Sequence, residues 1–196
     1  MRKPHDTPRT GGRPSNSAPT RFAVFGVGNV LLGDDGAGSS VIHLLQSTYD
    51  FPDNVEVEDL GTPGLELLAH VAGHDVVIFV DAVAEDAAPG TVRIYDRQSI
   101  VDACPALRVG PHDPALGDTL LALEFAGEGP REAMLVGIVA ASTASGIGLC
   151  PAVRAALPAA AEAVVAELAR HGLLITKQSR VAATVTPWWL ELGETR

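Results

Sequence analysis

The stretch FGVGNVLLGDDGAG, residues 25–38, decides the fold of this chain, because it joins a strand-like apolar run to a helical pattern through a glycine-rich turn. Such turns are first suspected of cradling phosphate. A dinucleotide fingerprint would need glycine where the chain has Leu31, and no Gly-Lys-Ser/Thr of a P-loop follows. The carboxylates of Asp34 and Asp35 stand where an anionic phosphate would lie. The turn therefore favours binding of a cation. The alternative is that one aspartate caps the helix and the other is a solvated acid in the first helical turn.

Apolar runs and helical patterns alternate outward from this turn. Five apolar runs predict buried strands: Phe22–Phe25, Val55–Val57, Val76–Val80, Thr91–Tyr95 and Met134–Val139. Helices are predicted over Gly36–Tyr49, over Gly64–Ala72, from the N-cap Asp113 onward, and over Pro151–His171, with a kink or restart at Pro158. The alternation predicts a single-domain α/β three-layer sandwich. Its twisted sheet has about five mostly parallel strands with helices on both faces.

Composition divides the chain into a core and two tails. Residues 1–20 are rich in Pro, Gly and Ser and predict a disordered tail, residues 21–175 form the domain, and residues 176–196 form a C-terminal extension. The net charge is −10, and the first 21 residues carry five basic groups against one acid. The remaining body is therefore strongly acidic and would repel a phosphate backbone, which excludes nucleic acid as a partner.

Membrane and secreted classes are also disfavoured. The apolar runs are far too short to span a bilayer, and the N-terminal stretch lacks the apolar region of a secretory signal. The two cysteines, Cys104 and Cys150, form no CxxC motif and fit a reducing compartment. We expect a cytoplasmic protein without membrane partners.

Three candidate site residues follow predicted strands or precede a helix. Asp81 ends the run VVIFVD, Asp59 ends VEVED, and His112 precedes a predicted helix N-cap. Each has a plainer interpretation as a turn former, a loop contact or a surface residue. Ligands of open parallel sheets bind beyond the carboxyl ends of the strands, where such residues meet.

Together, Asp35, Asp81 and His112 could form a carboxylate, carboxylate and imidazole set. Mixed oxygen and nitrogen ligands suit nickel or zinc, and three protein ligands leave positions open for water or substrate. The sequence has no HExxH and no G-x-S-x-G, which disfavours a zincin or a serine hydrolase.

Four stretches, in order, resemble the hydrogenase maturation proteases, the endopeptidases that complete the large subunit of nickel–iron hydrogenases. They are GVGNVLLGDDGAG (26–38), DLGTPGLELL (59–68), VVIFVDAV (76–83) and GPHDPALGDTLLAL (110–123). LVGIVA followed by GIGLCPAV is similar to the late strand and final-helix start of that family. The resemblance covers about residues 22–172. It departs at Cys150, where a small hydroxyl residue would cap the helix better.

The resemblance implies a twisted five-stranded sheet and a metal-binding set that falls on Asp35, Asp81 and His112. Asp59 matches another acid of the family and is the candidate general base. The implied activity is one cut in the C-terminal region of the large-subunit precursor after nickel insertion. The metal is then nickel supplied by the precursor, which zinc or cadmium could replace in a crystal.

Two other function classes remain open on the same fold. One is a non-catalytic maturation factor that recognises the nickel site without cutting. The other is a nucleotide-binding α/β domain, which the missing third glycine disfavours.

Overall fold

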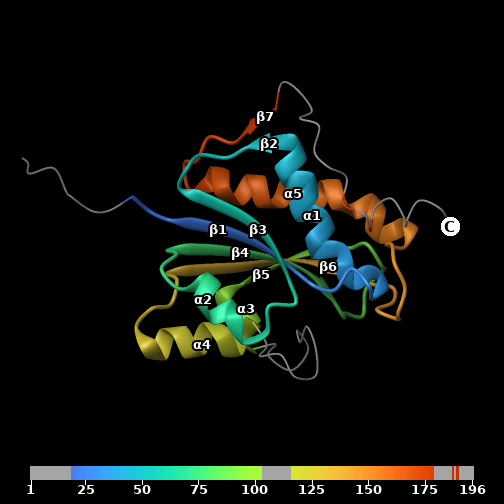
Figure 1. Ribbon diagram of the computed structural model, residues 1–196, viewed down its shortest axis with the longest axis horizontal. Coiled ribbons are helices and arrows are strands. Elements are labelled where there is room, and N and C mark those ends of the chain that lie inside the picture. The colour runs from blue at the N-terminus through green and yellow to red at the C-terminus, as the bar shows by residue number, and fades with distance from the viewer. Residues whose placement is uncertain (1–18, 103–115, 179–186, 188, 190–196) are drawn as a thin grey trace, which may run out of the picture.

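The computed structural model describes residues 19–102, 116–178, 187 and 189, and a five-stranded sheet forms its centre (Figure 1). The strands of this sheet are β1 (Phe22–Val27), β3 (Val55–Gly61), β4 (Val76–Val83), β5 (Val92–Asp96) and β6 (Glu132–Val139). Their order is β3-β1-β4-β6-β5. The first four are mutually parallel, and β5 runs antiparallel to β6 at one edge.

Helices cover both faces of the sheet, which confirms the predicted α/β three-layer sandwich (Figure 1). One face carries α1 (Ala37–Thr48) and α5 (Pro151–Arg170). The other carries α2 (Leu67–Val71), α3 (Arg97–Asp102) and α4 (Leu116–Ala126). Short 3-10 turns η1 (Gly33–Gly36) and η2 (Gly64–Glu66) precede α1 and α2, and a separate two-stranded ribbon pairs β2 (Tyr49–Asp50) with β7 (Thr176–Lys177).

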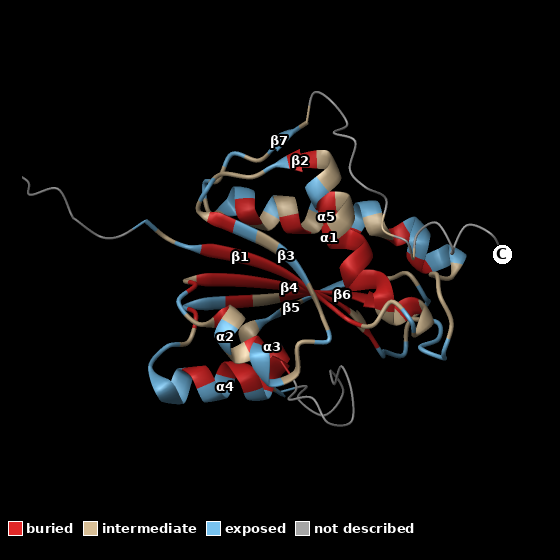
Figure 2. Cartoon of the chain, in the orientation of Figure 1, coloured by how far each residue is buried: buried red, intermediate tan, exposed pale blue. Residues whose placement is uncertain are grey.

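Two apolar cores form because side chains alternate along each central strand. In β1, Phe22 and Val24 pack into the core under α1 and α5. Ala23 and Phe25 pack into the core under α2 and α4. The central strands are therefore buried on both faces, as Figure 2 shows for β1 and β4. This is the environment that parallel strands require.

The structure differs from the sequence-based expectation in several elements. Strand β3 does not stop at the predicted apolar run but continues to Gly61, and α3 and the β2–β7 ribbon were not predicted. The predicted restart at Pro158 is wrong, because α5 is one continuous helix. Its apolar side packs on the sheet and on α1, and this packing outweighs the loss of one helical hydrogen bond. The predicted cap Asp113 lies outside the described residues.

The connections of the sheet leave a crevice at the carboxyl ends of β1 and β4. After β1 the chain continues to β3 at one edge of the sheet, and after β4 it continues to β5 at the opposite edge. A reversal of this kind is where open α/β sheets bind ligands. Within the described part of the chain, no helix combines the length and the apolar character needed to cross a bilayer.

Candidate functional site

The loop after β1 approaches η1 so closely that only glycine fits at its start. Gly28 has a φ of +127°, and a Cβ placed on it would lie 1.9 Å from the carbonyl oxygen of Asp35. An L side chain suits neither that φ nor that space. One residue later, the backbone N–H of Asn29 donates to Asp35 Oδ2 at 2.7 Å. The turn therefore orients the half-buried Asp35 carboxylate through its own backbone.

Asp81 lies close to Gly28, near the end of β4. Its side chain is buried, its Oδ1 accepts the N–H of Ala82 at 2.7 Å, and this oxygen lies 3.6 Å from the position that a Cβ on Gly28 would take. Strands β1 and β4 are neighbours, with Gly26 paired to Val80. The structure thus brings two of the predicted metal-binding residues together at the crevice. We call Asp35 and Asp81 the acid pair.

The electrostatics of the acid pair favour a bound cation. Burial raises the pKa of Asp81 well above its ordinary value, and the neighbouring charge of Asp35 raises it further. Burial also raises the pKa of Asp35, while the N–H of Asn29 opposes that shift. Within the described ranges, neither carboxylate forms an ion pair with a basic side chain. A divalent ion between them would offset both the free-energy cost of burying the two charges and the repulsion between them. The donor set therefore fits a hard or borderline metal ion.

Asp34, the neighbour of Asp35, has a different role. It is 2% exposed, and three backbone N–H groups donate to its carboxylate. Ala141 and Ser142 donate to Oδ2 at 2.8 and 3.2 Å, and Cys150 donates to Oδ1 at 2.7 Å. We call this arrangement the Asp34 clasp. It ties the loop between β6 and α5 to the glycine-rich turn.

Neither aspartate caps a helix, contrary to the plainer interpretation of the sequence. The residues at the N-cap positions of η1 and α1 are Leu32 and Gly36, and neither position has a side-chain cap. Cys150 caps α5, where its Sγ accepts the N–H of Val153 at 3.5 Å. This is a long bond to a weak acceptor, as expected where a hydroxyl would serve better.

Asp59 lies beside the acid pair and not within it. It stands on the exposed edge strand β3, and its Oδ1 accepts the hydroxyl of Ser39 at 2.8 Å and the N–H of Gly61 at 3.1 Å. The same carboxylate lines a pocket of about 150 Å³ together with Gly28 and Asn29. Asp59 is therefore held in a fixed orientation next to the loop that orients Asp35.

The third predicted metal-binding residue, His112, lies outside the described residues. Among the residues that the structure does describe, no three Asp, Glu, His or Cys side chains stand close enough to hold a metal ion. The acid pair therefore supplies two ligands, and Asp59 does not complete a set with them. A third protein ligand has to come from elsewhere in the chain or from a partner.

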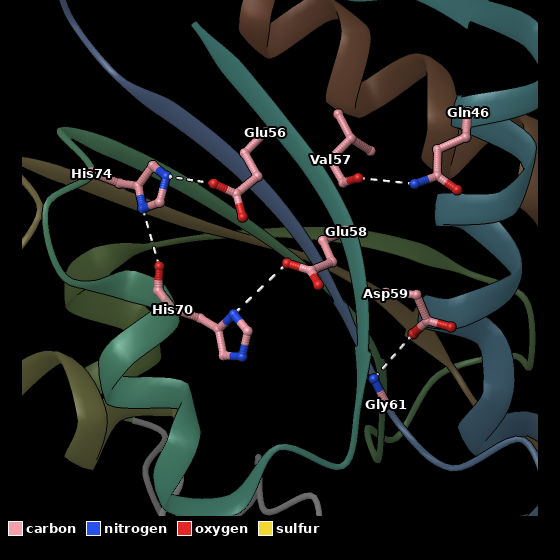
Figure 3. Close-up of polar contacts among 8 residues, drawn as sticks. All are labelled: Gln46, Glu56, Val57, Glu58, Asp59, Gly61, His70 and His74. Carbon is pink, nitrogen blue, oxygen red and sulfur yellow. Dashed lines mark hydrogen bonds and ion pairs between the residues drawn. The ribbon is translucent and has the colours of Figure 1, made fainter.

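Sequence reasoning missed a pair of histidines four residues apart, His70 and His74 (Figure 3). His74 is buried, and its ring nitrogens contact Glu56 Oε2 at 3.2 Å and the carbonyl oxygen of His70 at 3.0 Å. His70 lies 3.7 Å from Glu58 Oε2. Glu56 and Glu58 are two residues apart on β3, so their side chains lie on the same face of the sheet. Their contacts with His74 and His70 hold the α2 segment to this edge strand. Two spacings in the sequence could have indicated this contact. His70 and His74 are four residues apart, as on one side of a helix, and Glu56 and Glu58 are two residues apart, as on one face of a strand.

The comparisons with known proteins agree with this architecture. A family model described as hydrogenase maturation protease matches residues 39–167. The hydrogenase 2 maturation protease of Escherichia coli K12 is 42% identical over 154 residues, which are 78% of this chain and 93% of that protein. The hydrogenase expression/formation protein HupM of Azotobacter chroococcum is 36% identical over 171 residues, 87% of this chain and 82% of that protein.

A solved structure shares the fold over almost its whole length. The hydrogenase maturating endopeptidase HybD from E. coli superposes with a TM-score of 0.76 at 38% sequence identity. The alignment covers 82% of this chain and 99% of that one. The fold and a substantial part of the sequence are therefore held in common with that endopeptidase.

Proposed function

This chain belongs to the hydrogenase maturation protease family and is a maturation endopeptidase, and we propose that it removes the C-terminal peptide of a nickel-loaded precursor of a nickel–iron hydrogenase large subunit. The single observation that supports this substrate is the acid pair. Asp35 and Asp81 are two partly or fully buried carboxylates without a basic partner in the described part of the chain.

The nickel belongs to the substrate in this proposal. Asp35 and Asp81 contact the metal that the precursor carries, and His112 supplies a nitrogen ligand. When the precursor lacks nickel, the repulsion between the charges of Asp35 and Asp81 is not neutralised. Such a precursor therefore binds weakly. Recognition of the metal then fixes the position of the scissile peptide relative to the crevice. Positioning of this kind accounts for a large part of the rate acceleration in many enzymes.

The water that attacks the peptide carbonyl needs activation. Two sources are compatible with the site: the precursor's metal acting as a Lewis acid, or a carboxylate such as Asp59 acting as general base. In the second case Asp59 takes a proton from the water as its oxygen bonds to the carbonyl carbon, and the proton then passes to the departing amine. Asp59 is the candidate because it is exposed at the pocket beside the acid pair.

A processing assay tests the proposal. Purified precursor, with or without nickel, is incubated with the wild-type protein and with the Asp81→Ala and His112→Ala variants, and the C-terminus is determined by mass spectrometry. We expect the wild type to truncate only nickel-loaded precursor and both variants to fold normally without cutting. The exposed Asp86 offers a matched control as Asp86→Asn, which should cut like the wild type.

Two results would contradict the assignment. Normal cleavage of nickel-loaded precursor by both variants would remove the acid pair and His112 from the site. Precursor that binds the wild type but is never truncated would favour the non-catalytic recognition factor. For Asp59→Asn, a lower rate with unchanged precursor binding would favour a general base.

A further inference from the structure

Asn29 stands in the loop after β1, and three of its polar groups are held by hydrogen bonds. Its backbone N–H donates to Asp35 Oδ2 at 2.7 Å, and its carbonyl oxygen accepts the N–H of Leu32 at 2.9 Å. Its side-chain Oδ1 accepts the N–H of Leu31 at 3.0 Å. Because a backbone N–H requires an acceptor, the last bond also identifies which side-chain atom is the amide oxygen.

The side-chain nitrogen of Asn29 is the polar group that this network does not use. Within the described ranges of the chain, Nδ2 donates to no acceptor. The residue is half-buried and lines the pocket of about 150 Å³ beside the acid pair, which is also lined by Gly28, Ser39, Asp59, Thr62 and Trp189. The amide therefore has two N–H donors for a group that binds next to the acid pair, on a side chain that is already held in place.

We propose that Asn29 is a catalytic residue whose Nδ2 donates a hydrogen bond to the carbonyl oxygen of the peptide bond that is cut. This inference rests on the proposed function, since the carbonyl is that of the precursor held by its metal at Asp35 and Asp81. It adds to that function the group that stabilises the negative charge developing on the carbonyl oxygen.

The charges around the crevice create the need for such a donor. In the described part of the chain, neither Asp35 nor Asp81 forms an ion pair with a basic side chain, and Asp59 is the one charged residue among those that line the pocket. When water attacks the peptide carbonyl, the carbonyl oxygen becomes negative, and nearby carboxylates raise the free energy of that charge. A neutral donor that is oriented before the reaction lowers it.

The other donors at this pocket are already used or are not held in place. The hydroxyl of Ser39 donates to Asp59 Oδ1 at 2.8 Å, and the N–H of Gly61 donates to the same oxygen at 3.1 Å. Thr62 is exposed, and no described contact orients its hydroxyl. Asn29 therefore combines a fixed side chain with unused donors.

Asn29 acts in this reaction only as a hydrogen-bond donor. The water oxygen bonds to the carbonyl carbon, the carbonyl oxygen takes the electron pair and accepts the Nδ2 hydrogen bond, and one water proton passes to the scissile nitrogen. The carbon–nitrogen bond then breaks, the electron pair re-forms the carbonyl, and a carboxylic acid and an amine are released. Asn29 neither gains nor loses a proton in either step.

Cleavage kinetics of two variants test the assignment. Asn29→Asp keeps an oxygen acceptor for the N–H of Leu31 and removes the amide donors, whereas Asn29→Ala removes the donors without adding charge. The donor is the group that both variants lose, so we expect kcat for nickel-loaded precursor to fall about 100-fold in each, with little change in KM. A wild-type kcat in either variant would overturn the proposal.

Asn54, which directly precedes β3, offers a matched control. Its Nδ2 donates to the carbonyl oxygen of Thr20 at 2.9 Å, so Asn54→Asp makes the same chemical change at the opposite end of that strand. We expect Asn54→Asp to cut at the wild-type rate and Asn29→Asp to remain folded by circular dichroism at the assay temperature. An equal loss of kcat in Asn54→Asp would overturn the proposal, because the effect would then not be local.

A binding measurement separates this proposal from the proposed function. Immobilised wild-type protein and both Asn29 variants are compared for capture of nickel-loaded precursor. We expect equal capture, because the proposed hydrogen bond strengthens only as charge develops on the carbonyl oxygen. Loss of capture by Asn29→Ala would assign Asn29 to substrate binding and overturn its catalytic role. If wild-type protein captures precursor and never cuts it, both proposals fail; if wild type and both variants cut it equally, the assignment of Asn29 alone fails.

Discussion

Two adjacent aspartates of the glycine-rich turn stand in opposite environments. Asp34 is deeply buried and accepts three backbone hydrogen bonds, all from the loop between β6 and α5. Asp35 is half-buried, accepts one described hydrogen bond and faces a second carboxylate, that of Asp81. The acid with more donors holds the loop between β6 and α5 to the turn, and the acid with fewer donors is the one that contacts the metal in the proposed function.

The comparison shows how a buried carboxylate can be classified from its partners. A carboxylate that receives several N–H groups has its charge stabilised inside the protein. A carboxylate beside another carboxylate, without a basic partner, lacks that stabilisation and gains it when a cation arrives. In this chain the two cases occur at consecutive positions, so substitutions at Asp34, Asp35 and Asp81 test the distinction directly.

The largest expected effect is on stability, at the Asp34 clasp. Asp34→Ala leaves the N–H groups of Ala141, Ser142 and Cys150 without their acceptor. A hydrogen bond to a charged group contributes about 1.5 to 3 kcal/mol, and three are lost, while water can reach the exposed Ala141 and Ser142. We therefore expect the free energy of unfolding to fall by about 3 kcal/mol. Urea unfolding followed by circular dichroism measures the loss. A decrease below about 1 kcal/mol would mean that the clasp is not a structural element.

The next effect is on activity, at Asp35. Asp35→Asn keeps the shape of the side chain and removes a charge from the acid pair. We expect kcat/KM for nickel-loaded precursor to fall about 100-fold or more, equivalent to about 2.7 kcal/mol, with the free energy of unfolding unchanged or increased. Asp34→Asn is the matched comparison, and it should lose stability first. If Asp35→Asn destabilised the fold as much as Asp34→Asn, the two aspartates would not differ in role.

The smallest effect is a pH-dependent gain in stability from Asp81→Asn, measured in EDTA. Burial and the charge of Asp35 raise the pKa of Asp81 in the folded state. The native protein therefore binds this proton at higher pH than the unfolded chain does. As a result, ionised Asp81 costs stability above its folded pKa.

Asp81→Asn removes that cost, so the variant should unfold at higher urea than the wild type at pH 8, by on the order of 1 kcal/mol. The difference should shrink as the pH falls toward about 4, near the pKa of an aspartate in an unfolded chain. Asp86→Asn should show no such gain, because Asp86 is exposed. A variant less stable than the wild type at pH 8 would contradict the electrostatic description of the acid pair.

The fold was largely predictable because its signals are local. Apolar runs identified all five strands of the main sheet, and their alternation with helical patterns identified the sandwich. Elements held by distant contacts were not predictable in the same way. The β2–β7 ribbon joins Tyr49–Asp50 to Thr176–Lys177. A two-residue strand has no sequence pattern from which its distant partner could be predicted. The extension of β3 to Gly61 runs through polar residues that resemble a turn.

The site was predictable in part. The position of Asp35 in the turn and of Asp81 after an apolar run placed both at the carboxyl edge of the sheet, and the structure brings them together. The role of Asp34 depends on N–H groups more than a hundred residues away, so local sequence could only suggest a helix cap. Trp189 lies in a stretch without periodicity, and its contact with the pocket at Asp59 has no sequence signal. His112 remains a prediction.

The short ribbon of β2 and β7 has a consequence for the way the pocket is assembled. It fastens the chain at Thr176–Lys177 to the end of α1, and Gln178 adds hydrogen bonds to the carbonyl oxygens of Gln46 and Tyr49. Trp189 follows in the same chain, so its arrival at the pocket is an intramolecular event. The wall that Trp189 gives to the pocket is therefore supplied by the same chain, and its formation does not depend on the concentration of the protein.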